Sequence, residues 1–567
     1  MKPSQFSYAA CTHSVTVMLL AAAVYASLLI AGCGNVTPVV STQDNLAVKD
    51  YFGLIDRVKK EQPELVEALT KFPKGADLHN HLSGTVMPED FIALGAAGGG
   101  CFGPDPLVPA MYTIASATSP DVCRSGFKLL QQANAEERQQ LQRSLSMYQF
   151  NDKGVTSIQA GHDHFFATFG RFGAVSGSPD NMGPMLAKLL RQENAENVSH
   201  VETMISFQSA AASHLADLLR QKYPDAATYM QSSNYPALYD YLQSAGLNDA
   251  VVAAQKDIAT YMNGLNAVLN CGNSARDLAC GVSFDFQASV NRNSSLSDGS
   301  ADLPKIFTQT ALSCLLADTE RRVTGVNLLS GEDAPVSMQS FTTQMKFFSY
   351  FHDRFPLVNI ALHAGEITPY FAGNGNPALK EHLAGSIQAG AKRLGHAVSF
   401  TYLDDADKAE VAVLMKSSNV AVEINLTSNA QILGVSDDAH PFQQYFRKYG
   451  IPVVFATDDE GVSYADFTDE WIYATRQYHI TYAEAVRLAR SSLQYSFKPG
   501  TPLWQDVLSA SVVSQCAGET LGSAIPGEPC RTFLGSSEKA GAQWRYETKL
   551  SGFDKAYGAT LRKYLGN

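Results

Sequence analysis

The stretch Asp77-Leu78-His79-Asn80-His81-Leu82-Ser83-Gly84 carries two histidines two positions apart. In a β-strand, residues two apart lie on the same face, so both imidazole rings would point the same way, while Leu78 and Leu82 would point the other way. Two histidines on one face can bind one divalent metal ion through neutral ring nitrogens. Because paired histidines are also common as ordinary surface or core residues, a metal site needs further ligands elsewhere in the chain.

The composition indicates a large globular protein of acidic character. The chain has 567 residues, of which 45% are hydrophobic, and a net charge of −12 with a pI near 5.6. This length suits one large α/β barrel with insertions, or two to three ordinary domains. The acidic balance argues against a nucleic-acid partner, since the most basic local stretch is only Arg321-Arg322.

The first 33 residues have the features of an export signal. Lys2 gives a short positive region, residues 15–30 are mostly apolar, and Ile30-Ala31-Gly32-Cys33 resembles a bacterial lipobox. We expect residues 1–33 to be a signal peptide in which Cys33 is lipidated and anchors an exported protein to a membrane, facing the periplasm or the cell exterior. The alternatives are an ordinary cleaved signal or a signal anchor, although the apolar run is short for a membrane span. Residues 34–50 are polar and are predicted to be a tether.

Cysteine usage agrees with export. Beyond the targeting segment, six cysteines form three sequence-local pairs in Gly-, Asn- or Pro-rich segments: Cys101 with Cys123, Cys271 with Cys280, and Cys516 with Cys530. Such pairs are typical of disulfides formed in an oxidising compartment. Cys314 lies in an apolar pattern and is predicted to be a buried free thiol. No Cys-x-x-Cys pair occurs, which argues against a cysteine-ligated zinc.

Eight short apolar runs with strand character alternate with helical patterns. The runs lie at about 75–82, 197–205, 280–288, 322–329, 357–363, 393–398, 419–425 and 452–457. This alternation predicts an α/β fold, a (β/α)₈ TIM-type barrel over residues 51–510, with helical insertions at about 83–196 and 206–279. A helix is expected over 51–72, and a C-terminal extension, 511–567 with a helical tail at 537–563, is expected to pack on the barrel.

Polar residues suited to catalysis follow five of these strands. They are His79 and His81 at the first strand, Gly331-Glu332-Asp333 after the fourth, His363-Ala364-Gly365-Glu366 after the fifth, Gly395-His396 after the sixth, and Asp458-Asp459 after the eighth. In a (β/α)₈ barrel these ends form the rim that carries the active site. One histidine after a strand is usually an ordinary loop residue, but five such ends in order predict a shared site.

Four motifs in this order, HNHLSG, HAGE, GHA and TDD, resemble the adenosine deaminase family of the metal-dependent amidohydrolase superfamily. The resemblance extends from about residue 72 to 500. The lead-in Pro73-Lys74-Gly75 and the export signal are similar to the growth-factor-related branch of that family. The resemblance implies one zinc ion (Zn²⁺) per chain, held by His79, His81, His363 and Asp458, with water at the remaining position.

The resemblance also implies the other roles. Glu366 would protonate purine N1, His396 would orient the attacking water, and Asp459 would lie near that water and purine N7. The backbone N–H of Gly331 would contact purine N3, an approach that the missing side chain allows. The implied reaction is zinc-dependent deamination of adenosine or 2′-deoxyadenosine to inosine or 2′-deoxyinosine and ammonia, in purine salvage or in the use of extracellular nucleosides.

Three positions depart from the family pattern. Ser83 stands where an Asp that can hold the ribose 5′-hydroxyl is usual, Glu460 stands where Pro is usual, and Asn425-Leu426 replace Cys-Pro. A serine can donate or accept a hydrogen bond but carries no charge. Ser83 therefore puts the recognition of a nucleoside in question, but it does not affect the deamination chemistry. The alternative explanation for all three is that these loop positions changed without an effect on function.

Aromatic residues are expected to cover the purine. Phe166 and Phe169 match the family's apolar segment beside the pocket. The nearby histidines His162 and His164 are two apart and raise the alternative of a second metal site. Glu202 lies on the second strand, where a carboxylate is usual in the family.

Other functions stay open at this point. The same chemistry on adenine or another 6-aminopurine is the nearest alternative, motivated by Ser83. Ester or amide hydrolysis by two metals is less favoured, because it needs a bridging carboxylated lysine or a glutamate and no lysine follows the fourth strand. A non-catalytic surface-binding protein is disfavoured by the intact ligand set and Glu366. The expected partners are a purine nucleoside and a membrane, and the oligomeric state is open.

Overall fold

The structure is a computed structural model that describes residues 42–150, 157–225, 230, 234–507 and 509–566. Residues 43–567 form one compact unit. The predicted signal peptide with Cys33, and the predicted tether up to residue 41, lie outside the described residues. In the part of the chain that is described, no helix has both the length and the apolar character that a membrane span requires.

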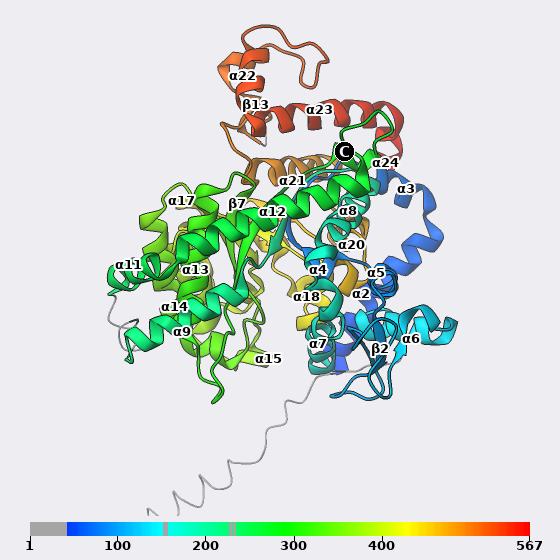
Figure 1. Ribbon diagram of the computed structural model, residues 1–567. Coiled ribbons are helices and arrows are strands. Elements are labelled where there is room, and N and C mark those ends of the chain that lie inside the picture. Colours follow the sequence, from blue (N-terminus) through cyan, green and yellow to red (C-terminus); the bar gives the residue numbers. More distant parts are fainter. Residues whose placement is uncertain (1–41, 151–156, 226–229, 231–233, 508, 567) are drawn as a thin grey trace, which may run out of the picture. The chain divides into compact units, whose positions relative to one another are not determined.

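Eight parallel strands form a barrel (Figure 1). In spatial order they are β1 (Gly75–His81), β5 (Val198–Ile205), β6 (Ser283–Asn291), β7 (Val323–Leu329), β8 (Asn359–Ala364), β9 (Arg393–His396), β10 (Ala421–Ile424) and β11 (Val453–Phe455). The sheet returns on itself through two backbone hydrogen bonds. The N–H of Asp458 donates to the carbonyl of His79 (2.9 Å), and the N–H of His81 donates to the carbonyl of Asp458 (3.0 Å). The predicted (β/α)₈ fold is confirmed.

Helices cover the outer face of the strands, so almost every strand residue is buried. The larger covering helices are α13 (Leu303–Thr319), α14 (Pro335–Arg354), α16 (Ala378–Gln388), α17 (Asp405–Ser417), α20 (Phe467–Gln477) and α21 (Tyr482–Tyr495). Short helices lie near the carboxyl ends of the strands: α15 (Pro369–Ala372), α18 (Leu426–Leu433) and α19 (Glu460–Ser463). The third strand, β6, starts three residues later than the predicted run because the 3-10 turn Leu278–Gly281 precedes it.

The segment between β1 and β5 contains more than the predicted helices. The helices are α4 (Leu82–Thr85), α5 (Pro88–Ala97), α6 (Ala135–Leu145), α7 (Ile158–Ser176) and α8 (Pro179–Ala195). Three short strands, β3 (Tyr112–Ala115), β2 (Cys101–Pro104) and β4 (Lys128–Leu129), form an antiparallel sheet. The expectation of helices alone was incomplete, because strands of two to four residues are too short to show a hydrophobic period.

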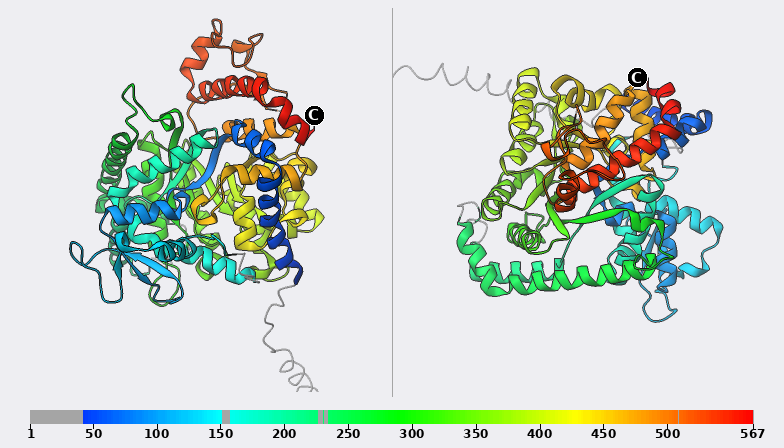
Figure 2. Two further views of the ribbon diagram at one scale, coloured as in Figure 1. Left: turned by 90° about the vertical axis from the view of Figure 1, so that its right-hand side faces the viewer. Right: turned by 90° about the horizontal axis from the view of Figure 1, so that it is seen from above.

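The segment between β5 and β6 is helical, with α9 (Ser209–Lys222), α11 (Tyr235–Ala245) and α12 (Leu247–Leu269). The long helix α12 runs along one side of the unit, drawn in green in Figure 2. The three predicted disulfides are present, Cys101–Cys123, Cys271–Cys280 and Cys516–Cys530, and Cys314 is a buried free cysteine.

Both terminal regions are helical, as predicted, but each contains two helices. The helix predicted at 51–72 is two helices, α2 (Thr42–Glu61) and α3 (Pro63–Lys71), because the proline ring at Pro63 interrupts the helix and starts a new one. Since α2 includes residues 42–50, the predicted tether is at least nine residues too long. The tail at 537–563 is also two helices, α23 (Glu538–Ala556) and α24 (Gly558–Leu565). They follow α22 (Cys530–Ser536), and α23 packs on α21 (Figure 1).

Candidate active site

Histidine and aspartate side chains converge at the carboxyl ends of the strands. Two overlapping groups have ligand atoms within 4.8 Å of one another: His79, His363, His396 and Asp458, and His81, Asp458 and Asp459. Nε2 of His81 lies 3.3 Å from Nε2 of His363 and 3.2 Å from Oδ1 of Asp458. Nε2 of His79 lies 3.5 Å from the same Oδ1 and, although buried, has no hydrogen-bond partner among the described residues. The structure therefore brings the four predicted metal ligands together.

Closure of the barrel sets this geometry. His79 and His81 are at the end of β1, and Asp458 follows β11. The backbone of Asp458 has a φ of 60°, a left-handed conformation that is unfavourable for a residue with a side chain. The two backbone hydrogen bonds that close the barrel hold Asp458 in this conformation. The connection that closes the sheet thus also places the aspartate opposite the two histidines.

The electrostatics of the cluster favour a cation. Nδ1 of His79 donates to Oε2 of Glu423 at 2.7 Å, which leaves the lone pair of Nε2 facing the cluster. Although burial opposes a charged ring, hydrogen bonds and charges from Asp458 and Glu423 raise the pKa of His79 to about 10. A place that attracts a proton this strongly also suits a metal ion, which takes the proton's position. Three imidazole nitrogens and one carboxylate match the ligands that zinc prefers.

Supporting residues hold these ligands in place, and the sequence analysis missed most of them. Nδ1 of His363 lies 2.8 Å from Oδ1 of Asn327 in β7. Glu423 is bound by Arg393 (2.5 Å), which also binds Glu202 (2.6 Å), and all three side chains are fully buried. The sequence did contain one signal for this network. Glu423 is a charged residue inside the apolar run 420–424, and a buried carboxylate requires a partner.

The three residues predicted to be catalytic surround the cluster. Nε2 of His396 lies 3.7 Å from Oε1 of Glu366 and 3.8 Å from Oδ2 of Asp458. Burial, together with the nearby Asp458 carboxylate, raises the pKa of Glu366 well above its usual range, so this carboxyl group retains a proton that it can donate. Burial also raises the pKa of Asp459 to about 8, against the attraction of His81.

Glycine makes room for Asp459. A Cβ atom on Gly84 would lie 1.5 Å from Oδ1 of Asp459. The first motif therefore contributes two candidate metal ligands and also the space in which the second carboxylate of the TDD motif lies.

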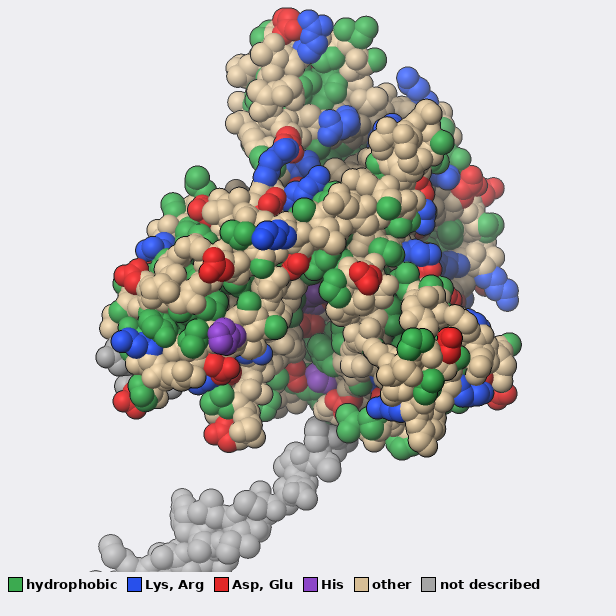
Figure 3. All heavy atoms as spheres, in the orientation of Figure 1, with side chains coloured by type: hydrophobic (Ala, Val, Ile, Leu, Met, Phe, Trp, Pro, Cys, Tyr) green, Lys and Arg blue, Asp and Glu red, His purple; other side chains and the backbone are tan. Residues whose placement is uncertain are grey.

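A cavity of about 460 Å³ opens beside the cluster and is lined by His81, His363, Glu366, His396, Asp458 and Asp459. The residues predicted to contact a purine, Phe166 and Phe169 of α7 and Gly331 after β7, also line this cavity. Figure 3 shows histidine and acidic side chains inside a furrow near α7. Aromatic walls with a few polar groups at one end suit a flat heterocyclic ligand.

Ser83 is not among the described residues that line this cavity; it lies on α4. The structure therefore gives no support to Ser83 as a substrate contact. Ser83 comes soon after His79 and His81 in the sequence, but it is part of the short helix α4, of which the neighbouring Gly84 approaches Asp459.

His162 and His164 do not form a second metal site in the described structure. Both lie on α7, where residues two apart point to different faces. Nε2 of His162 lies 3.3 Å from Oδ2 of Asp333, whereas Nε2 of His164 donates to the carbonyl of Ser146 at 3.0 Å.

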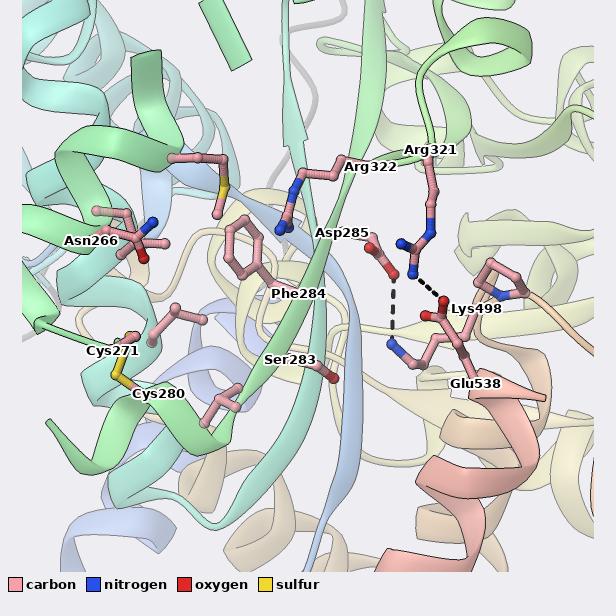
Figure 4. A pocket seen from close by; sticks show the side chains of 15 residues that line it. Asn266, Cys271, Cys280, Ser283, Phe284, Asp285, Arg321, Arg322, Lys498 and Glu538 are labelled. Carbon is pink, nitrogen blue, oxygen red and sulfur yellow. Dashed lines mark hydrogen bonds and ion pairs between the residues drawn. A yellow bond between two sulfur atoms is a disulfide. The ribbon is translucent and has the colours of Figure 1, made fainter. Parts of the chain in front are cut away.

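A second cavity, of about 340 Å³, lies at the amino-terminal ends of β6 and β7. Figure 4 shows its charged side chains turned toward one another, with Lys498 3.8 Å from Asp285 and Arg321 paired with Glu538. It contains none of the motif residues, and these two cations are already paired, so the first cavity is the candidate active site.

The fold and the cluster define a (β/α)₈ barrel with a candidate metal site at the carboxyl ends of its strands. Residues 307–502, which include His363, Glu366, His396 and Asp458, match the family model described as adenosine deaminase. Over this span the chain is similar to the adenosine deaminase family, the family that its motifs resemble.

Individual relatives match over shorter spans. The chain is 32% identical to an adenosine deaminase of Lactococcus lactis over 23% of its own length and 33% of that protein. It is 29% identical to the N6-mAMP deaminase of Arabidopsis thaliana over 25% of its length and 35% of that protein. These alignments span about a third of each relative. The solved structure of arabidopsis ADAL complexed with IMP aligns over 76% of this chain and 94% of its own, with 17% identity and a TM-score of 0.47.

Proposed function

We propose that this chain is a zinc-dependent hydrolase that deaminates adenosine and 2′-deoxyadenosine. The observation that carries the proposal is the position of Glu366, a buried carboxyl group whose pKa is raised well above its usual range, in the same cavity as the His79, His81, His363 and Asp458 cluster. The donor set fits one zinc ion, and the buried Nε2 of His79 has no other described partner. When bound, zinc lowers the pKa of a coordinated water and so provides a nucleophile at neutral pH.

The protein side chains then perform the remaining steps. Glu366 donates its proton to purine N1, which makes C6 electrophilic. His396 hydrogen-bonds the oxygen that adds to C6, Asp459 binds near N7, and the N–H of Gly331 meets N3. Water adds at C6 and ammonia leaves, so a 6-aminopurine becomes a 6-oxopurine. Phe166 and Phe169 pack against the base and exclude bulk water from the reaction.

The lining favours an uncharged substrate. Among the described lining residues are three carboxyl groups, Glu366, Asp458 and Asp459, and no lysine or arginine. A 5′-phosphate would enter a cavity without a lysine or arginine side chain to pair with it, which is unfavourable. We therefore place nucleosides ahead of nucleotides, with free adenine or another 6-aminopurine as the alternative substrate because Ser83 lies off the cavity.

The test is ammonia release by the purified fragment starting after residue 40, loaded with zinc, from adenosine, 2′-deoxyadenosine, adenine and AMP. We expect turnover of the two nucleosides, loss of turnover with a chelator, and recovery on adding zinc back. Asp458→Ala is the inactive control. Equal or faster turnover of adenine would replace the nucleoside assignment, and a zinc-loaded protein that releases no ammonia from any of the four would support a non-catalytic binding protein.

We also propose that the protein is an exported lipoprotein anchored through Cys33. The lipobox-like Ile30-Ala31-Gly32-Cys33 and three disulfides typical of an oxidising compartment support this. Cys33→Ala should move the protein from the membrane fraction to the soluble fraction and abolish labelling by a radioactive fatty acid. A variant that stays in the membrane fraction would contradict lipidation at Cys33.

A further inference from the structure

A line of buried polar groups leads away from His396, behind the candidate active site. It consists of Asn429 on α18, His440 after the 3-10 turn Asp437–Ala439, and the backbone of Phe442. His396, Asn429 and His440 are all at most 2% exposed. We infer that His440 and Asn429 are positioning residues that fix which nitrogen of His396 carries hydrogen, so that His396 presents an N–H group to the active site.

The direction of the hydrogen bonds is set at the outer end. The backbone N–H of Phe442 donates to Nδ1 of His440 at 3.2 Å. Because a backbone N–H can only donate, Nδ1 of His440 must be an unprotonated acceptor, and the neutral ring carries its hydrogen on Nε2. Burial lowers the pKa of His440 to about 3, which agrees with a neutral ring.

The next link orients an amide. Nε2 of His440 lies 3.1 Å from Oδ1 of Asn429, so the ring N–H donates to the amide oxygen. The amide nitrogen of Asn429 then points the other way and lies 2.9 Å from Nδ1 of His396. An NH₂ group can only donate, and the amide nitrogen of Asn425 approaches the same Nδ1 at 3.3 Å. Nδ1 of His396 is therefore an acceptor, and the hydrogen of His396 is on Nε2.

This assignment separates His396 from the metal ligands. His79 and His363 direct their Nδ1 atoms to the oxygens of Glu423 and Asn327, so their Nε2 lone pairs face the cluster. His396 has the opposite arrangement, and its buried Nε2 has no other hydrogen-bond partner in the described structure. Although His396 lies within ligand distance of the cluster, its inward N–H cannot coordinate a cation. It is suited to donate a hydrogen bond to the oxygen that adds to C6, the one step of this inference that rests on the proposed function.

The orientation of Asn429 is what a mutation can reverse. In Asn429→Asp a carboxylate replaces the amide and accepts from both neighbours. His396 must then place its hydrogen on Nδ1 and turn a lone pair toward the active site. A histidine held in the wrong tautomer costs about 10⁴-fold in kcat in the serine protease triad, so we expect a loss on the order of 10²–10⁴-fold here, with zinc content and KM little changed.

The direct measurement is the tautomer itself. In zinc-loaded protein labelled with ¹⁵N-histidine, long-range ¹H–¹⁵N spectra distinguish protonated from unprotonated ring nitrogens, and the signals absent from His396→Gln identify His396. We expect hydrogen on Nε2 of His396 in the parent protein and on Nδ1 in Asn429→Asp. A parent protein with hydrogen on Nδ1 would overturn the inference, whether or not the variant folds.

Two substitutions of His440 test the hydrogen bonds between His440, Phe442 and Asn429. Glutamine can accept from the Phe442 N–H and donate to Asn429, so His440→Gln should keep the tautomer and most of the rate, whereas His440→Met should lose both. Equal rates in the two variants would contradict the relay. Because the spectra need no substrate, an inward N–H without adenosine turnover would refute only the proposed function, and adenosine turnover with hydrogen on Nδ1 would refute only this inference.

Discussion

Oε2 of Glu423 lies 2.7 Å from Nδ1 of His79, although the two residues are 344 positions apart in the sequence. The other oxygen of the same carboxylate binds Nε of Arg393 at 2.5 Å. Glu423 thereby fixes the tautomer of His79 and adds negative charge behind the candidate metal site, while Arg393 keeps the buried carboxylate ionised. Partners of this kind strengthen the basicity of a ligating imidazole.

Glu423→Gln should therefore weaken zinc binding. The amide keeps the size of the side chain but removes the charge and can turn its NH₂ toward His79, which disturbs the tautomer. We expect zinc affinity to fall about 10–100-fold, measured by competition with a chelator of known affinity. Glu470→Gln is a control, since Glu470 is also buried but accepts hydrogen bonds from the backbone of Leu426 and Thr427. Unchanged zinc affinity in Glu423→Gln would show that His79 is not a ligand of the kind proposed.

Glu366→Gln should separate proton donation from metal binding. Glutamine preserves the shape of the side chain but has no proton of comparable acidity to transfer. We expect one zinc per chain to remain and the turnover of adenosine to fall on the order of 10²–10⁴-fold. Asp458→Ala should lose zinc and turnover together. If Glu366→Gln kept more than about a tenth of the turnover, another group would have to be the acid.

Gly84→Ala should displace Asp459 without unfolding the protein. The new methyl group would lie 1.5 Å from Oδ1, 2.4 Å from Cγ and 2.7 Å from Cβ of Asp459, so the whole Asp459 side chain has to shift. We expect turnover to fall by at least about tenfold while the thermal midpoint changes little, because short displacements at a reacting centre are costly. Gly170→Ala on α7 is the matched control, since nothing lies within 4 Å of its added Cβ. Full activity in Gly84→Ala would remove Asp459 from the mechanism.

Local patterns were enough to predict the barrel and the residues that face its centre. The His79 and His81 pair, the HAGE and GHA motifs and the TDD motif each follow an apolar strand, and strand order alone places them on one rim. Pro63 could also have indicated a break between two helices, but the apolar stripe on both sides of it led to the prediction of one continuous helix. The small sheet of β2, β3 and β4 was not predictable, because its strands are too short to show an alternation of apolar and polar side chains.

The residues behind the site were not predictable in the same way. Glu423, Asn327, Asn429 and His440 matter because of which partner they face, and their partners come from other strands and loops of the closed barrel. A sequence shows that Glu423 is a charge in an apolar run, but only the three-dimensional structure shows that it faces His79 and Arg393. Ser83 shows the converse: it belongs to the right motif, yet it is not among the described residues that line the cavity.

The Arg393–Glu202 pair makes a prediction for acid stability. Although burial opposes ionisation, the charge of Arg393 holds the pKa of Glu202 at about 2, below its ordinary value of 4.5. A folded-state pKa below the unfolded one stabilises the protein above about pH 4.5, and this stabilisation is lost as the pH falls toward 2. The difference corresponds to a contribution on the order of 3 kcal/mol at neutral pH. Urea unfolding of the zinc-loaded protein, measured at fixed pH values between 7 and 3, should show stability decreasing across this window.

Glu202→Gln isolates this contribution. The variant should be less stable than the parent at pH 7, because Arg393 loses one of its two buried carboxylate partners and keeps only Glu423. Its stability should fall less steeply below pH 4.5, so the two curves should converge as the pH decreases. The comparison cancels the other acidic groups, which titrate in both proteins. Parallel curves for parent and variant would show that Glu202 keeps an ordinary pKa and that the Arg393 network does not account for the acid sensitivity.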